Sequence, residues 1–238
     1  MAITTGIGGK ATGKLGSNVY AVSSGVQIVR EYNPYVSNPA TEAQVEQRAK
    51  MKLMSQLAAV MAPVIAIPKD GLRSARNQWI SKNYPLSGYD DETATFDFLK
   101  AQLTNGNTPM PGLKVTRAGS NIFVTIADGA VTPQDVTRAV VVGYDITAAD
   151  QPIYLGSGII EYDADEDTWG SVNIFDAATE GTAVIFVYGI RDLSANASAK
   201  FADLGIASAT AVASLVANRT LNSSDFAFTQ TVGEKITW

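Results

Sequence analysis

The segment from Gly13 to Met61 constrains the fold of this chain more than any other, because its pattern changes from arm to hairpin to helix. Frequent glycines in residues 1–16 favour a flexible, extended arm that becomes ordered only against a partner. β-Branched and aromatic residues follow over 17–22 and 26–31, and the turn Ser23-Ser24-Gly25 between them predicts a β-hairpin. Because an isolated hairpin is only marginally stable in water, we expect a third strand or a neighbouring subunit to complete it.

An amphipathic helix is predicted from about Thr41 to Met61 or Ala62. Thr41 and Gln44 have the spacing of a capping box, and Pro63 disfavours the helical conformation for the residue before it. Apolar side chains recur at four-residue steps and predict one buried stripe. The stripe consists of Val45, Ala49, Leu53, Leu57 and Met61.

The rest of the chain changes period near residue 112. Helices are expected over 70–83 and 90–103, which gives a hairpin and helical domain over 17–111, ended by a Pro- and Gly-rich run. Short β-branched runs then predict an immunoglobulin-like β-sandwich over 112–192, so the expected fold class is α+β. Its strands are expected at Leu113–Arg117, Ile122–Ala127, Arg138–Tyr144, Ile153–Tyr162, Trp169–Phe175 and Thr182–Ile190.

Residues 193–238 are expected to form a C-terminal arm or closing elements. The Ala- and Ser-rich run 195–217 predicts either a short helix pair or an irregular arm. Partial alternation over 225–238 predicts a last strand.

The composition argues against most enzyme classes. The chain has no histidine and no cysteine, which excludes Ser–His triads, thiolate catalysis and the common zinc sites. We therefore expect that this protein is not an enzyme and that it binds no cofactor and no metal ion. No leader and no apolar run of about 20 residues is evident, so we expect no membrane contact and synthesis in the cytoplasm.

Two motifs come close to known ligand-binding loops. Gly8, Gly13 and Lys14 have the spacing of a phosphate loop, but Leu15 stands where a hydroxyl side chain must bind Mg²⁺, so a flexible arm is the simpler interpretation. The acidic run 163–167 resembles the start of a calcium loop, but its continuation lacks the required Gly and Glu. An acidic turn is favoured there, and weak divalent binding is left open.

Charge is distributed unevenly along the chain. Residues 1–85 carry ten Lys and Arg against four Asp and Glu, and residues 86–238 carry eight against nineteen, giving +6 and −11 within the net −5. Such polarity favours head-to-tail self-association, or contact of the basic half with an acidic partner or, non-specifically, with DNA. Two domains with unrelated surface charge explain it equally well.

The N-terminal motifs resemble those of a family of proteins encoded by phages of Bacteroidetes, including crAss-like phages and related prophages. The resemblance covers roughly residues 8–85 and implies a virion component made in the host cytoplasm, most simply a ring-forming tail or neck subunit. It also implies a cyclic homo-oligomer that contacts other virion proteins. The matching residues are Gly13, Lys14, Gly16, Val29, Arg30, Pro39, Thr41, Gln44, Gln47, Arg48, Ala49 and Lys50.

We expect the arm and hairpin, residues 1–31, to make contacts between subunits, together with part of the following helix. The interface candidates are Gly13, Lys14, Gly16, Val19, Tyr20, Val29, Arg30, Gln44, Gln47, Arg48, Leu53 and Leu57.

Three alternatives stay open from the sequence. A capsid auxiliary or decoration protein would use the N-terminal part as an anchor. A carbohydrate- or receptor-binding module would use Tyr162 and Trp169, beside the acidic turn, as a stacking platform. A carboxylate hydrolase would need pairs such as Asp90 with Asp91, or Asp163 with Asp165, to face a common cleft.

Overall fold

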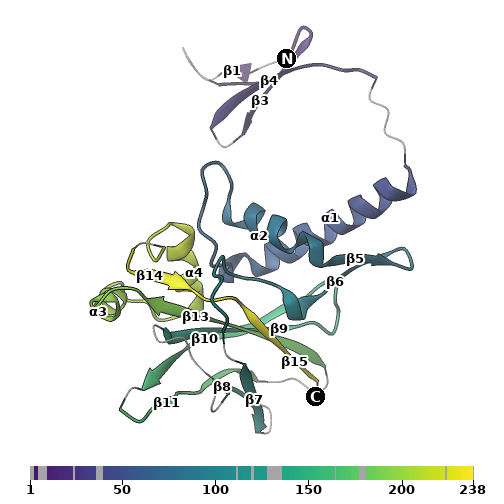
Figure 1. Cartoon of the computed structure of the whole chain (residues 1–238). Coiled ribbons are helices and arrows are strands. Elements are labelled where there is room, and N and C mark those ends of the chain that lie inside the picture. The colour runs from purple at the N-terminus through teal and green to yellow at the C-terminus, as the bar shows by residue number, and fades with distance from the viewer. Residues whose placement is uncertain are drawn as a thin grey trace. The chain divides into compact units, whose positions relative to one another are not determined.

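The protein is a mixed α+β chain, mostly of β-strands in several sheets, and divides into two compact units. The computed structural model describes residues 3–4, 10–23, 25–35, 40–110, 112–118, 121–127, 136–163, 165–176, 181–222 and 224–237 (Figure 1). Unit 1 spans Met1–Gln44 and unit 2 spans Val45–Trp238. The domain boundary predicted at 111/112 does not coincide with this division.

Unit 1 is a four-stranded antiparallel sheet in the order β1-β2-β3-β4. The predicted hairpin is confirmed as β3 (Asn18–Ser23) and β4 (Val26–Glu31), with a shorter turn, because Ser23 pairs directly with Val26. The prediction of a flexible arm is wrong for β1 (Ile3–Thr4) and β2 (Ala11–Leu15), which are strands. Gly16, with a φ of 60°, allows the tight turn that folds β2 back onto β3.

Unit 2 begins with helix α1, whose predicted ends are confirmed. α1 spans Glu42–Met61, directly after Thr41, and continues as a 3₁₀ turn over Ala62–Val64. The second helix, α2 (Ala75–Asn83), is shorter than predicted, because Asp70 and Arg73 pair with each other through their backbones. The side chain of Ser74 caps α2 by accepting a hydrogen bond from the Asn77 N–H at 3.2 Å.

The prediction of a helix over 90–103 is wrong. This region forms the hairpin β5 (Ser87–Asp90) and β6 (Thr93–Phe96), followed by a 3₁₀ turn at Phe98–Lys100. Asp91 and Glu92 form the turn with φ values of 44° and 62°, as a two-residue hairpin turn requires. The apolar residues after this turn follow the period of two that a strand requires.

The centre of unit 2 is a sheet in which two strands are buried on both faces. β9 (Val136–Asp145) and β13 (Thr182–Asp192) pair antiparallel at its middle. Their continuous apolar runs, such as Ala183–Tyr188, match this burial, since both faces of the sheet are covered. β10 (Ile153–Asp163) and β11 (Thr168–Trp169) extend the sheet beyond β9, and β14 (Phe226–Phe228) and β15 (Val232–Thr237) share the outer edge of β13.

Each face of this sheet is covered by a different layer (Figure 1). Helices α1, α2, α3 (Ala197–Asp203) and α4 (Ala209–Ala217) contribute to the core on one face. The small sheet β7 (Leu113–Ala118), β8 (Asn121–Ile126) and β12 (Val172–Asp176) packs against the other.

An immunoglobulin-like sandwich confined to 112–192 is not confirmed, because the large sheet also contains β14 and β15 and shares a core with the helices. The residues after 192 are closing elements, and the predicted helix pair is present as α3 and α4. Among the described residues, no helix is long and apolar enough to span a membrane. Residues 119–120 and 128–135, which lie between expected strands, are outside the described residues.

Candidate subunit interface

The sheet of unit 1 has two faces that the strand register defines. Tyr20 lies opposite Gly13 and Val29, so these residues share one face, which we call the tyrosine face. Val19 lies opposite Lys14 and Arg30, and these define the basic face. The remaining members follow by alternation. The tyrosine face also carries Leu15, Val22 and Gln27, and the basic face also carries Ala21, Val26, Ile28 and Tyr32.

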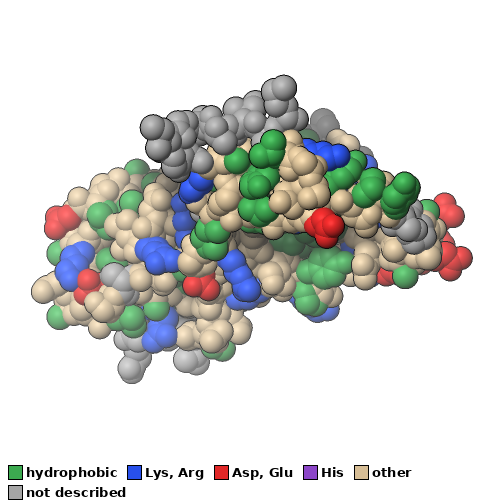
Figure 2. All heavy atoms as spheres, turned by 90° about the horizontal axis from the view of Figure 1, so that it is seen from above, with side chains coloured by type: hydrophobic (Ala, Val, Ile, Leu, Met, Phe, Trp, Pro, Cys, Tyr) green, Lys and Arg blue, Asp and Glu red, His purple; other side chains and the backbone are tan. Residues whose placement is uncertain are grey.

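Both faces expose large apolar side chains. Val29 on the tyrosine face is 52% exposed, and Ile28 on the basic face is 44% exposed. No described side chain of unit 1 is buried. An antiparallel sheet with one solvated face normally packs its other face on a core, and the described residues of unit 1 form no such core. Figure 2 shows exposed hydrophobic side chains as green patches on one face of the whole molecule.

The basic face keeps its cations at the surface. The Lys14 ammonium lies 3.6 Å from the centroid of the Tyr32 ring, a cation–π contact, and the Tyr32 backbone N–H donates to the Ser17 carbonyl at 2.6 Å. Neither Lys14 nor Arg30 forms an ion pair with a described residue. The face therefore combines exposed apolar side chains with cations, Lys14 and Arg30, that have no carboxylate partner among the described residues.

Gln27 is a positioning residue that the sequence analysis missed. Its side-chain oxygen accepts from the Ala11 N–H at 2.8 Å, and its side-chain nitrogen donates to the Ala11 carbonyl at 3.0 Å. These bonds tie β4 to the start of β2. The available signal was a single amide side chain within the apolar run of β4.

The predicted interface residues of the helix divide into two groups. Gln47 and Arg48 are exposed on the first half of α1, and Gln44 is half-buried. Leu53 and Leu57 are 5% and 0% exposed inside the core of unit 2, so the prediction that they form a subunit interface is wrong. An apolar stripe reports that a helix is covered, but not whether its own chain or another chain covers it.

The acidic turn, residues 161–167, is the second notable surface. One oxygen of Asp163 accepts from the backbone N–H groups of Asp165 and Glu166 at 2.9 and 3.2 Å, which closes the turn. The Tyr162 hydroxyl donates to the Asp167 carboxylate, and this hydrogen bond raises the pKa of Tyr162. Within the described chain, none of these carboxylates forms an ion pair.

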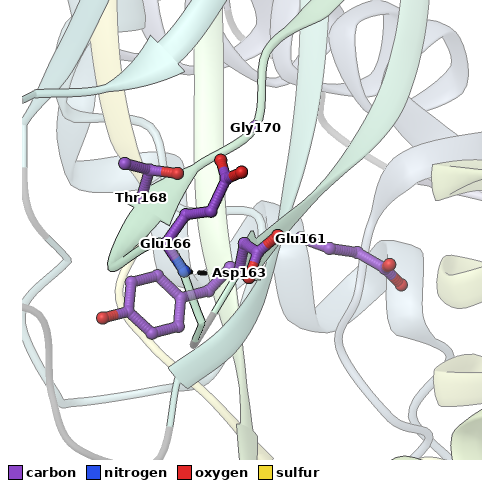
Figure 3. A pocket seen from close by; sticks show the side chains of 6 residues that line it. Glu161, Asp163, Glu166, Thr168 and Gly170 are labelled. Atoms are coloured by element: carbon purple, nitrogen blue, oxygen red, sulfur yellow. Dashed lines mark hydrogen bonds between the residues drawn. The ribbon is translucent and has the colours of Figure 1, made fainter.

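A hollow of about 440 Å³ lies beside the acidic turn, lined by Glu161, Asp163 and Glu166 among others. In Figure 3 the side chains of Glu161 and Glu166 point away from each other. No described group of three or more acidic side chains is arranged to hold a metal ion. Divalent binding at this turn therefore gains no support from the geometry.

The two aromatic residues beside the turn pack on each other. The rings of Tyr162 and Trp169 lie 5.3 Å apart between centroids and are tilted by 56°. Trp169 also packs against the core between the two sheets. Two tilted, mutually packed rings do not form the flat surface on which a sugar ring stacks.

The remaining predicted chemistries find no matching geometry in the described chain. Lys14 and Leu15 lie in strand β2, whereas a phosphate loop would lead into a helix. Asp90 ends β5 and Asp91 lies in the turn, both exposed at the tip of a hairpin. Gly8 of the phosphate-loop motif and Pro39 of the helix motif lie outside the described residues.

Unit 1 brings most of the predicted interface residues together in one small sheet. Gly13 and Tyr20 lie on the tyrosine face, Lys14 and Arg30 lie on the basic face, and Gly16 serves the turn. Comparisons of the chain with protein-family models, with curated proteins and with solved structures give no match.

Proposed function

We propose that this chain is a non-enzymatic structural subunit of a tailed phage virion, in which copies assemble into a ring of the tail or neck. The observation that carries the proposal is the contrast in burial between the units. Unit 2 contains a complete core, whereas unit 1 exposes apolar side chains on both faces of its sheet. Apolar surface that its own unit does not bury is typical of an interaction site.

The tail or neck location is inferred from the N-terminal motifs. Gly13, Lys14 and Gly16, with the strand end Val29-Arg30, resemble the phage family described above. These residues are part of the exposed sheet. The resemblance and the exposed surface therefore concern the same unit, which supports a role in assembly.

We also infer an immunoglobulin-like plan for the strands of 112–192. The sheet β12-β8-β7 faces the larger sheet across an apolar layer that includes Ile122, Val141 and Ile185. Such a two-layer arrangement gives each subunit a rigid body that carries the assembly sheet.

The test is the absolute mass of the full chain by light scattering over a range of concentrations, followed by negative-stain imaging. We expect a closed ring whose mass is a multiple of 25.1 kDa. Ile28→Asp places a charge on the exposed sheet and should reduce the assembled mass to that of a single chain. Ile153→Asp is the matched control, since Ile153 is an exposed strand isoleucine of unit 2 and its change should leave the mass unaltered.

Two outcomes would contradict the proposal. A chain that stays single at every concentration would exclude a self-assembling ring and favour a capsid auxiliary protein that needs a template. A ring that survives Ile28→Asp but is lost with Ile153→Asp would show that the exposed sheet of unit 1 does not form the contact between subunits.

A further inference from the structure

We propose that the basic face of unit 1 docks onto the acidic turn of a second copy of this chain. The inference rests on the proposed ring assembly and names the partner surface for it. It is carried by charge complementarity, by the hollow beside the acidic turn and by the mixed apolar character of both surfaces.

The charges of the two surfaces are opposite and uncompensated. Lys14 and Arg30 are exposed on the basic face and form no ion pair with a described residue. The acidic turn presents five carboxylates, those of Glu161, Asp163, Asp165, Glu166 and Asp167, and contains no Lys or Arg. Complementary surfaces of this kind steer association and fix the register of docking.

The arrangement of the carboxylates fits two separate cations better than one bound ion. Glu161 and Glu166 point apart around the hollow (Figure 3). Lys14 and Arg30 lie on strands that flank β3, so their backbones are about 9.6 Å apart, twice the spacing between neighbouring strands. Two long, flexible side chains from such positions can reach two spread carboxylates.

Apolar groups accompany the charges on both surfaces. Val26, Ile28 and Tyr32 are all exposed on the basic face. The half-buried rings of Tyr162 and Trp169 lie beside the acidic turn. Contact between these groups would remove apolar surface from water, which charge pairing alone does not do.

A nucleic acid is a poorer occupant of the basic face. A protein that makes about 6–10 phosphate contacts gains much of its DNA affinity from them, whereas the described residues of unit 1 carry three cations, Lys10, Lys14 and Arg30. A second copy brings a compact set of carboxylates to the same place. The two docking surfaces differ, so the contact is head-to-tail, the type of contact that closes a ring.

The experiment uses two full-length charge-reversed variants. One carries Lys14→Glu and Arg30→Glu, and the other carries Glu161→Lys and Glu166→Lys. Each variant alone opposes like charges, so we expect it to need at least about tenfold more protein for half-assembly than wild type. Mixed in equal amounts, the two variants can alternate, so that each contact between unlike variants again joins opposite charges, and light scattering should show that assembly is recovered.

The matched control is Asp90→Lys with Glu92→Lys, an equal charge change at the exposed tip of the β5–β6 hairpin. This variant should assemble like wild type. Circular dichroism and the urea midpoint of each variant establish that it is folded.

Failure of this inference is distinguishable from failure of the ring proposal. If wild type and both charge-reversed variants assemble equally, the ring stands and the docking surfaces are wrong. If the variants do not recover on mixing, pairing between copies is excluded. If Lys14→Glu with Arg30→Glu instead abolishes binding of a 30-base-pair DNA duplex (a length of about three helical turns) and leaves the assembled mass unchanged, the basic face serves nucleic acid and the inference is overturned.

Discussion

Strands β4 of unit 1 and β13 of unit 2 have similar apolar sequences and opposite environments. Val29 in β4 is 52% exposed, whereas Val187 in β13 is fully buried. Burial of one such side chain stabilises a fold by about 1.5–3 kcal/mol, so β13 contributes stability along its length while β4 leaves about half of this contribution unused. The composition of a strand therefore does not determine how much the strand stabilises the fold. That contribution depends on the layers that cover the strand.

Charged residues show the same contrast. Arg138 in β9 is 4% exposed, stacks 4.0 Å from the Phe201 ring centroid, and donates to Asp192 and Ser198 at 2.9 Å. Unit 2 thus provides a partner for its buried cation. Unit 1 leaves Lys14 and Arg30 at the surface.

The largest expected effect tests this difference in charge pairing. Asp192→Ala leaves the Arg138 guanidinium buried without its counter-ion and should lower the free energy of unfolding by about 3–5 kcal/mol. Lys14→Ala, the matched change in unit 1, should leave it nearly unaltered. Urea unfolding followed by far-UV circular dichroism reports on both units, and tryptophan fluorescence reports on unit 2 alone, because every tryptophan lies after residue 44. Equal losses in the two variants would contradict the contrast.

The second prediction compares two isoleucines. Ile185→Ala opens a cavity between the sheets of unit 2 and should cost about 2–5 kcal/mol in the free energy of unfolding. Ile28→Ala removes a side chain that is already 44% exposed and should cost less than about 1 kcal/mol in the unassembled chain. A result in which Ile28→Ala lowers the free energy of unfolding only at concentrations where the chain assembles would sharpen the comparison. It would show that another copy of the chain buries Ile28.

The smallest effect is a dependence on pH. Burial raises the pKa values of Tyr144 and Tyr188, whose hydroxyls have no hydrogen-bond partner within the described chain. A raised folded-state pKa favours the neutral phenol, so the associated stability is complete below pH of about 10 and declines above it. Tyr188→Phe should reduce this decline by about 1.4 kcal/mol per pH unit above pH 10, without loss of stability at pH 7.

Tyr35→Phe is the control for this measurement, because Tyr35 is 89% exposed in unit 1. Its unfolding free energy should follow wild type from pH 7 to about pH 11. A Tyr188→Phe variant with an unchanged alkaline slope would show that another group controls the decline.

Sequence patterns predicted the elements whose signals are local. The ends of α1 follow from Thr41 and Pro63, and the β3–β4 hairpin follows from strand-forming residues on either side of Gly25. β9 and β13 were also predicted, because continuous β-branched runs are typical of strands buried on both faces. These features need no knowledge of distant residues.

The wrong predictions concern residues whose structure is determined by contacts with residues far away in the sequence. Residues 93–96 were assigned to a helix, although Phe96 packs beside Trp79 as part of a hairpin. Leu53 and Leu57 were assigned to a subunit interface, but they face the core of their own unit. For the candidate site, the sequence indicated Lys14 and Arg30 but not their shared face, because only the register of β2, β3 and β4 places them together.

The position of β13 has a consequence for synthesis of the chain. Its outer edge is completed by β14 and β15, which leave the ribosome only after α3 and α4. At a translation rate of about 5–20 residues per second, this largely apolar strand waits for seconds with an open hydrogen-bonding edge. Nascent chains crowded on one messenger would be most vulnerable to strand exchange in that interval, until β15 pairs with Thr182–Val187 and closes the edge.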